Sequence, residues 1–203
     1  MSSDQSPAPR RRLSRDDRLR QLLDVAWQLV REEGTDALTL GHLAELAGVT
    51  KPVVYDHFGD RAGLLAALYE DFDARQNQVF ATAIETSEPT LDDRAWVIAS
   101  CYVDCVLLQG REIPGVIAAL AGSPELEAIK REYDVIFLGK CRDALAPFAL
   151  DGVIGQAALR GMLGAADALS QAAASGEISP LEAQEELFAS IKAMVNRARV
   201  QKN

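Results

Sequence analysis

The chain has 203 residues, of which 48% are hydrophobic and 25% are charged, a composition typical of a globular protein with one sizeable core or two small ones. No apolar run approaches the ~18 residues of a membrane span, and residues 1–12 lack the apolar segment of a secretory signal, so we expect a cytoplasmic protein with no membrane partner. Three cysteines and two histidines favour neither a disulfide framework nor a metal site, and no cofactor is expected.

The net charge of −9 is unevenly distributed along the chain. Residues 1–70 hold 9 Lys/Arg and 11 Asp/Glu, whereas residues 71–203 hold 12 and 19. Residues 10–20 contain six arginines and two aspartates, so the local field can be positive although the chain is acidic. Residues 1–13 are predicted to be a disordered basic arm, whose arginines either enter a minor groove or only raise non-specific affinity for DNA.

A first helix is predicted from about Arg15 to Glu33. Ser14 and Asp17 form a capping pair at its start, and its apolar side chains recur on one face up to Gly34, which ends it. We expect this helix to cover the two shorter helices that follow, because those two alone could not bury enough surface to be stable.

Two short helices are predicted between residues 38 and 58, in the segment TLGHLAELAGVTKPVVYDHF. Thr39 can cap the first helix and Gly48 ends it; Thr50 can cap the second, and Pro52 fits its first turn. Two helices joined by a glycine-containing turn are typical of the helix-turn-helix, whose second helix enters the major groove of DNA.

The segment from Thr50 to Arg61, TKPVVYDHFGDR, resembles the recognition helix and following helix start of the TetR family of bacterial repressors. The motif region covers about Arg15 to Arg75. The resemblance implies an all-α fold of about nine helices, with a homeodomain-like, three-helix helix-turn-helix domain at 14–75. Residues 76–203 would then form a helical domain for ligand binding and dimerisation.

The helix-turn-helix contains eight candidate DNA contacts. Hydroxyl and backbone donors at helix N-termini suit phosphate groups, and the exposed first turn of the second helix can face base edges. The tyrosine, the histidine and the arginine of the motif match phosphate-contacting positions of the family. Each residue could instead be an ordinary surface group. The candidates are Thr39, Thr50, Lys51, Pro52, Val53, Tyr55, His57 and Arg61.

Beyond the motif, the apolar pattern predicts helices from Arg61 to about Ala83, from about Thr90 to Leu108 with Gly110 as its end, from Pro114 to Ala121, and from Ser123 to just before Pro147. These helices carry more bulky residues than one face needs, which predicts a shared core or a cavity for a small apolar or aromatic molecule. Candidate ligand contacts combine apolar bodies with weakly polar groups: Trp96, Cys101, Tyr102, Cys105, Tyr133, Phe137 and Met162.

The last two predicted helices suggest dimerisation. Residues 152–174 are rich in glycine and alanine, which let another helix approach closely, and Ser179 with Glu182 forms a capping box for the final helix. Two such helices, doubled by a two-fold axis, make a four-helix interface, and the family resemblance implies the same homodimer. The candidate interface residues are Ala158, Gly161, Ala165, Leu187, Ile191 and Val195.

We therefore expect a homodimeric repressor that reads an inverted repeat in double-stranded DNA and is released from it by a small hydrophobic ligand. A constitutive or architectural DNA-binding protein would share the motif and differ only in the C-terminal domain. An enzyme is the other alternative, for which Cys101 and Cys105 could form a redox pair. The sequence contains no glycine-rich phosphate loop or nucleophile elbow, so no catalytic residue is expected.

Overall fold

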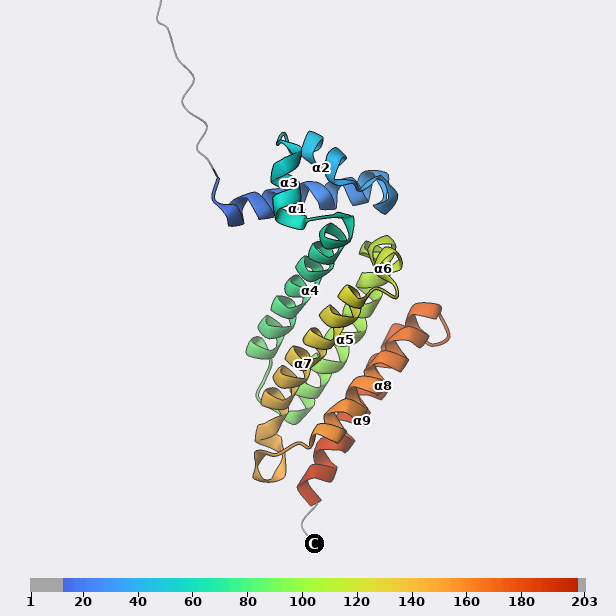
Figure 1. Cartoon of the computed structure of the whole chain (residues 1–203). Coiled ribbons are helices and arrows are strands. Elements are labelled where there is room, and N and C mark those ends of the chain that lie inside the picture. Colours follow the sequence, from blue (N-terminus) through green and yellow to red (C-terminus); the bar gives the residue numbers. More distant parts are fainter. Residues whose placement is uncertain (1–12, 201–203) are drawn as a thin grey trace, which may run out of the picture. The chain divides into compact units, whose positions relative to one another are not determined.

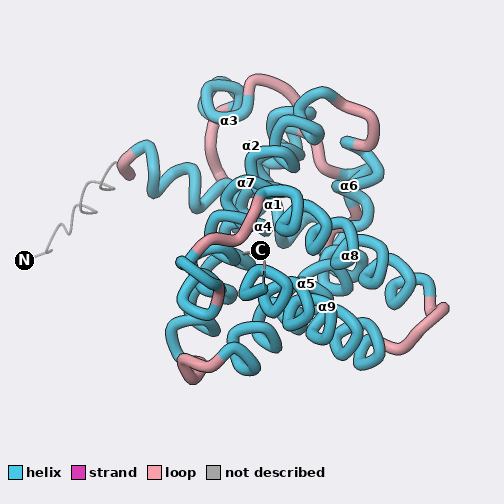
Figure 2. The backbone as a smooth tube through the Cα atoms, turned by 90° about the horizontal axis from the view of Figure 1, so that it is seen from below, coloured by secondary structure: helices cyan, strands magenta, loops and turns pink. Residues whose placement is uncertain are grey.

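The structure, a computed structural model, describes residues 13–200, and the predicted arm with Arg10, Arg11 and Arg12 lies outside them. Within the described range the fold is all-α, with nine α-helices, three short 3-10 helices and no strand. Short loops join the helices (Figure 2). The chain divides into two compact units, one reaching to Leu68 and the other beginning at Tyr69, where the sequence analysis expected a boundary near residue 75.

The first unit contains three helices and the start of a fourth. Its elements are α1 (Arg15–Glu33), a 3-10 helix (Thr35–Ala37), α2 (Leu40–Leu46), α3 (Lys51–Phe58) and the first turns of α4 (Arg61–Thr86). The core is formed by side chains that are at most 1% exposed, namely Leu22, Ala26, Leu29, Leu38, Leu43, Ala44, Val54, Leu64 and Leu68.

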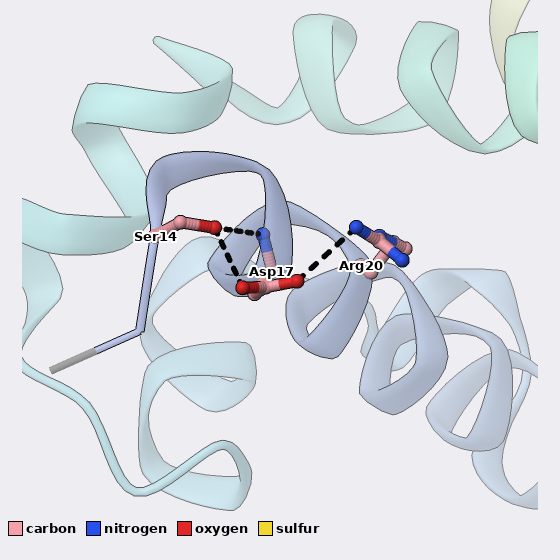
Figure 3. Close-up of polar contacts among 3 residues, drawn as sticks. All are labelled: Ser14, Asp17 and Arg20. Atoms are coloured by element: carbon pink, nitrogen blue, oxygen red, sulfur yellow. Dashed lines mark hydrogen bonds and ion pairs between the residues drawn. The ribbon is translucent and has the colours of Figure 1, made fainter. Parts of the chain in front are cut away.

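The start of α1 shows how a local sequence signal fixes a helix end. The Ser14 hydroxyl accepts a hydrogen bond from the Asp17 backbone N–H at 3.0 Å and donates one to the Asp17 carboxylate at 2.7 Å (Figure 3). The other carboxylate oxygen of Asp17 lies 3.1 Å from the Arg20 guanidinium. The first of these bonds satisfies one of the backbone N–H donors that a helix start leaves open, and the predicted bounds of α1 are confirmed.

The second unit holds the rest of α4 and five further helices. These are α5 (Leu91–Glu112), α6 (Pro114–Leu120), α7 (Pro124–Leu145), α8 (Gln156–Ser175) and α9 (Pro180–Val200), with 3-10 helices at Ala146–Phe148 and Leu150–Gly152. Helices α5, α8 and α9 run alongside one another (Figure 1) and form the largest contacts of this unit. No helix among the described residues is long and apolar enough to cross a membrane.

Three predicted helix ends differ clearly from the structure. Gly110 lies inside α5, which continues to Glu112, because one glycine costs a helix only about 1 kcal/mol and packing against α8 and α9 outweighs that cost. Helix α8 begins at Gln156 and not at residue 152, because Gly152 has a φ of +66° and the chain there forms a separate 3-10 turn. The predicted end of α4 at Ala83 is three residues early, since the helix reaches Thr86.

Candidate functional site

The turn between α2 and α3 is set by local contacts. The Thr39 hydroxyl accepts a hydrogen bond from the His42 backbone N–H at 3.1 Å, which fixes the start of α2. Gly48 has a φ of +63°, a conformation that side chains rarely adopt. The Val49 N–H then donates to the Ala44 carbonyl at 3.0 Å. The chain is thereby turned from α2 into α3 within a few residues.

Two buried side chains fix the orientation of α3. Val54 is fully buried and Phe58 is 7% exposed, so the opposite face of the helix is presented to solvent. Tyr55 on that face is 53% exposed. The other candidate DNA contacts on or before α3 are exposed (Thr50, Lys51 and Pro52) or half-buried (Val53 and His57).

Thr50 occupies the N-cap of α3, as predicted, but its hydroxyl makes no capping hydrogen bond. In this respect Thr50 differs from Thr39. Pro52, in the first turn, has no N–H, which removes one of the donors that a helix start leaves open. The Thr50 hydroxyl therefore stays available to an external group such as a phosphate oxygen.

The Lys51 side chain lies across the start of α2. A β-carbon built on Gly41 would be 3.6 Å from Lys51 Cε and 3.7 Å from Nζ. The ammonium group therefore lies beside α2, in the turn of helix that Thr39 caps. A cation and a hydroxyl supplied by adjacent helices suit the phosphate groups of a duplex.

The Arg61 side chain forms hydrogen bonds within the first unit. Its Nε donates to the Leu38 carbonyl at 3.0 Å, and one terminal nitrogen donates to the Thr35 carbonyl at 2.9 Å. The preceding residue, Asp60, caps α4 by accepting from the Gly63 N–H at 2.8 Å. Arg61 thus joins the start of α4 to the segment between α1 and α2, and only its remaining N–H groups could reach DNA.

Arg15 at the start of α1 contacts the recognition helix. Its guanidinium donates to the Asp56 carbonyl at 3.3 Å and lies 3.7 Å from the Asp56 carboxylate. The two side chains are 70% and 69% exposed, so this ion pair adds little stability. It does bring an arginine to the same face of the first unit as α3.

The second unit contains a cavity of about 540 Å³, lined by side chains of α4, α5, α7 and α8. This volume lies in the range of small-molecule sites. Five of the seven residues predicted to bind a ligand line it, namely Cys101, Tyr102, Cys105, Tyr133 and Phe137.

The other two predicted ligand residues lie outside the cavity lining. Trp96 is 37% exposed and packs edge-on against Phe188, with ring centroids 5.8 Å apart. Met162 is 5% exposed and belongs to the core of the second unit. Both lie on helices that line the cavity, but their side chains are turned toward α9 or into the core, a difference that helical periodicity alone does not resolve.

The cavity wall also holds acidic residues that the sequence analysis missed: Asp73 on α4, Asp134 on α7 and Asp167 on α8. A signal for the first was present, because Tyr69, Asp73 and Phe80 recur at helical spacing on one face of a long helix. Asp167 is a single carboxylate in the Gly/Ala-rich α8. Asp167 is exposed, so the apolar pattern of α8 gave no signal for it.

Burial acts on the ionisable groups of the cavity. It raises the pKa of Asp73 to about 6, although an amide hydrogen bond from Asn77 at 3.0 Å and the nearby Lys140 cation oppose the shift. Burial, with the charge of Asp73, also raises the pKa of Tyr133 and of Cys105 to about 12. The phenol and the thiol therefore stay neutral at pH 7, and Cys105 lacks the thiolate that redox chemistry needs.

Tyr102 links two walls of the cavity. Its hydroxyl donates to the Asp167 carboxylate at 2.5 Å, and its ring lies 5.1 Å from that of Phe137, centroid to centroid. Burial, and then this hydrogen bond, raise the pKa of Tyr102 well above its usual value. Tyr102 is thus a fixed donor to Asp167 and an aromatic surface of the cavity.

The six predicted interface residues separate into two groups. Leu187, Ile191 and Val195 on α9 are fully buried in the core of their own chain, so they present no surface to a second copy. Gly161 on α8 is exposed, and Ala158 and Ala165 are half-buried. The apolar face of α9 holds that helix against α5 and α8, which the sequence pattern could not distinguish from an intermolecular face.

The first unit is a helix-turn-helix with an anchored, outward-facing second helix, and it is joined to a helical unit that contains a cavity. Residues 22–68 match the model of the bacterial regulatory proteins of the tetR family. This match confirms the resemblance to the TetR family that the motif region predicted, over residues 22–68 of the chain.

Individual relatives agree with this assignment. The chain is 39% identical over 49 residues to the HTH-type transcriptional regulator AcrR of Shigella flexneri, covering 24% of this chain and 23% of the relative. It is 39% identical over 59 residues to the HTH-type transcriptional activator FasR of Mycolicibacterium smegmatis, covering 29% and 27%. The chain thus matches only about a quarter of the length of these relatives.

The likeness in fold extends over most of the chain. The crystal structure of the multidrug binding protein EbrR complexed with imidazole is similar with a TM-score of 0.67 at 17% sequence identity, and the match covers 91% of this chain and 96% of that one. At 17% identity this comparison shows a shared fold and gives no information on the ligands of this chain.

Proposed function

We propose that the protein is a homodimeric, DNA-binding transcriptional repressor whose affinity for its operator is lowered by a small molecule bound in the cavity of the second unit. Each subunit would insert α3 into the major groove. The two half-sites would then form an inverted repeat with centres about 34–36 Å apart.

The observation that carries this proposal is the outward face of α3. Val54 and Phe58 bury one side of the helix, and Lys51 and Tyr55 are exposed on the other. Lys51 would contact a phosphate or a guanine, and the Tyr55 hydroxyl a phosphate. Thr39, Thr50 and His57 would add phosphate contacts, with Pro52 and Val53 nearest the base edges, and Arg61 would contribute through N–H groups that the first unit does not use.

The test is a mobility-shift titration with DNA selected for binding from a random pool. We expect an inverted repeat to be enriched. Lys51→Ala should weaken binding at least tenfold and lower the slope of log K against log salt by about one. Arg142→Ala removes the same charge from an exposed position of α7 outside the cavity lining and should leave DNA affinity unchanged. Equal binding by both variants, or enrichment of no sequence, would contradict the assignment of α3.

The proposed dimer uses the outward faces of α8 and α9. On α8 these carry Gly161 and the half-buried Ala158 and Ala165, small residues that permit close helix packing. Gly161→Glu should therefore give a monomer in light scattering and lose operator binding. Gly110→Glu changes an exposed glycine of α5 with open space around it and should remain a dimer; a dimeric Gly161→Glu variant would argue against this interface.

The effector would act through α4. This helix begins at Arg61 in the first unit and continues as one wall of the cavity, where Tyr69, Asp73 and Phe80 line it. A ligand that fits only one position of α4 would favour the conformation with α4 in that position. If this conformation binds DNA less well than the other, the ligand relieves repression. EbrR, named as a multidrug binding protein, is a neighbour in fold consistent with such a site.

A DNA-binding protein without an effector is the second candidate. It would bind the same operator, so the gel shift does not separate the two. A ligand that binds the cavity and changes operator affinity would support the regulated form, whereas a ligand that binds with no effect on DNA affinity would support the constitutive one.

A further inference from the structure

The charged side chains around the cavity are unevenly distributed among its walls. Carboxylates come from α4, α7 and α8. The cationic side chains that line the cavity, Lys130 and Arg131, are both exposed on α7, where the exposed Glu127 accompanies them. The walls formed by α4 and α8 contribute carboxylates but no cation to the lining, and the wall formed by α5 contributes neither.

Two of these carboxylates lack a cationic partner within hydrogen-bonding distance. Asp134 is paired with Arg160, whose nitrogen lies 3.0 Å from its oxygen. Asp167 instead accepts from a phenol, that of Tyr102, and Asp73 accepts from the Asn77 amide. Within residues 13–200 neither Asp73 nor Asp167 forms an ion pair at 4.0 Å or less.

The Lys140 cation lowers the pKa of Asp73, but its ammonium group hydrogen-bonds to Asn77. Lys140 Nζ donates to the Asn77 side-chain oxygen at 3.0 Å and lies 3.3 Å from the Asn77 carbonyl. The Asn77 side-chain amide thus lies between Lys140 and the Asp73 carboxylate. Lys140 therefore acts on the Asp73 charge through this amide and does not pair with it directly.

Aromatic rings make up much of the remaining wall. Phe137 lies 5.4 Å from Phe80 and 5.1 Å from Tyr102, measured between ring centroids, and Tyr69 and Tyr133 complete the set. Aromatic faces carry negative partial charge, so they attract cations as well as apolar surface. The rings and the two unpaired carboxylates favour the same kind of ligand.

We propose that the cavity binds an aromatic organic cation, with its apolar body among the rings and its positive charge facing Asp73 and Asp167. This inference rests on the proposed function, in which the cavity is the effector site, and narrows the effector to one class. A neutral ligand would leave both carboxylates without a counter-charge. An anion would bring a like charge close to them.

A divalent metal ion could also neutralise the charge of the carboxylates. Among the described residues, however, no three His, Cys, Asp or Glu side chains are grouped so that they could hold one metal ion. The carboxylates lie on separate helices around a volume of about 540 Å³, which suits a larger cation with delocalised or shielded charge.

The experiment compares tetraphenylphosphonium with tetraphenylborate, two ions of nearly the same shape and opposite charge, by calorimetric titration of the full chain without DNA. We expect the phosphonium to bind and the borate to bind at least tenfold more weakly. The double variant Asp73→Asn with Asp167→Asn should weaken phosphonium binding at least tenfold. Asp143→Asn, an exposed carboxylate of α7 outside this cavity, should bind as the wild type does.

Borate binding as tight as phosphonium binding, no phosphonium binding, or an unaffected double variant would each overturn the inference. Circular dichroism and a melting curve of the double variant exclude loss of the fold as the cause of weaker binding. Because no DNA is present, these outcomes are independent of the gel shift. Failure of operator binding with retained phosphonium selectivity would overturn the regulatory function and leave the chemistry of the cavity intact.

Discussion

Gly63 and the carbonyl oxygen of Phe58 approach each other so closely that a β-carbon at residue 63 would lie 2.1 Å from that oxygen. This contact joins the last residue of α3 to the first turn of α4, where Asp60 also accepts from the Gly63 N–H. The position of the recognition helix in the first unit therefore depends on the absence of a side chain at Gly63.

Replacing Gly63 with alanine should destabilise the first unit. Since the clashing atom belongs to the backbone, one of the two helices must move, and we expect a loss of about 2–4 kcal/mol in the free energy of unfolding. Gly110→Ala is the matched control, because that helical glycine has open space around it and alanine should stabilise α5 by about 0.5–1 kcal/mol. Thermal and denaturant unfolding of both variants measure these changes. Similar stabilities would contradict the contact.

Arg61→Lys should also lower stability, by about 1–2 kcal/mol, although it keeps the charge. A lysine cannot reproduce the forked pair of bonds to the Leu38 and Thr35 carbonyls. Arg15→Lys, at a side chain that is 70% exposed, should change stability by less than about 0.5 kcal/mol. A denaturant midpoint unchanged in the Arg61 variant, with weaker DNA binding, would show that its role is contact with DNA and not packing.

The helix-turn-helix could be predicted from the sequence because its signals are local. Ser14 and Thr39 cap helices through bonds within three residues, and Gly48 has the positive φ that a glycine at a helix end suggests. Val54 and Phe58 both face inward, as the four-residue spacing of two apolar side chains on one helix face predicts.

The second unit was less predictable because its determinants are tertiary. Gly110 could not be recognised as an interior residue without knowing how strongly α5 is packed. Ile191 lies on an apolar helix face that suits a core and a subunit interface equally well, and the structure buries it within the chain. The cavity depends on which of several helix faces meet, so Asp73 and Asp167 could not be assigned to it from spacing alone.

Ser170→Ala should stabilise the second unit by about 1 kcal/mol. Ser170 is fully buried in α8, and its hydroxyl oxygen has no hydrogen-bond partner among the described residues. Alanine removes this desolvated polar atom and leaves only a small void. Ser175→Ala, at the exposed end of the same helix, should change stability far less. Urea unfolding of both variants makes the comparison, and a destabilised Ser170 variant would mean that the hydroxyl is satisfied by a group such as a bound water.

Asp73 should make stability depend on pH. Its pKa is raised from 3.8 to about 6 in the folded protein, so between these values the folded state binds more protons at this site than the unfolded chain. The contribution of Asp73 to the free energy of unfolding therefore falls as pH rises through this window, and levels off above about 6. Charged or titratable groups that act on this carboxyl from its own and neighbouring helices are Tyr69, Cys105, Tyr133 and Lys140.

The pH effect can be isolated with Asp73→Asn, which cannot titrate at this position. The stability of the variant relative to wild type should increase from about pH 4 to about pH 6 and then remain constant. The phenols and the thiol that act on Asp73 stay neutral throughout, because the pKa values of Tyr133 and Cys105 are about 12 and that of Tyr69 is also raised. Urea midpoints at several pH values provide the measurement, with the exposed Asp143→Asn as control. If the difference in unfolding free energy between wild type and Asp73→Asn stays constant across this range, Asp73 titrates as an exposed carboxyl does. Its charge would then not be buried in the wall of the cavity.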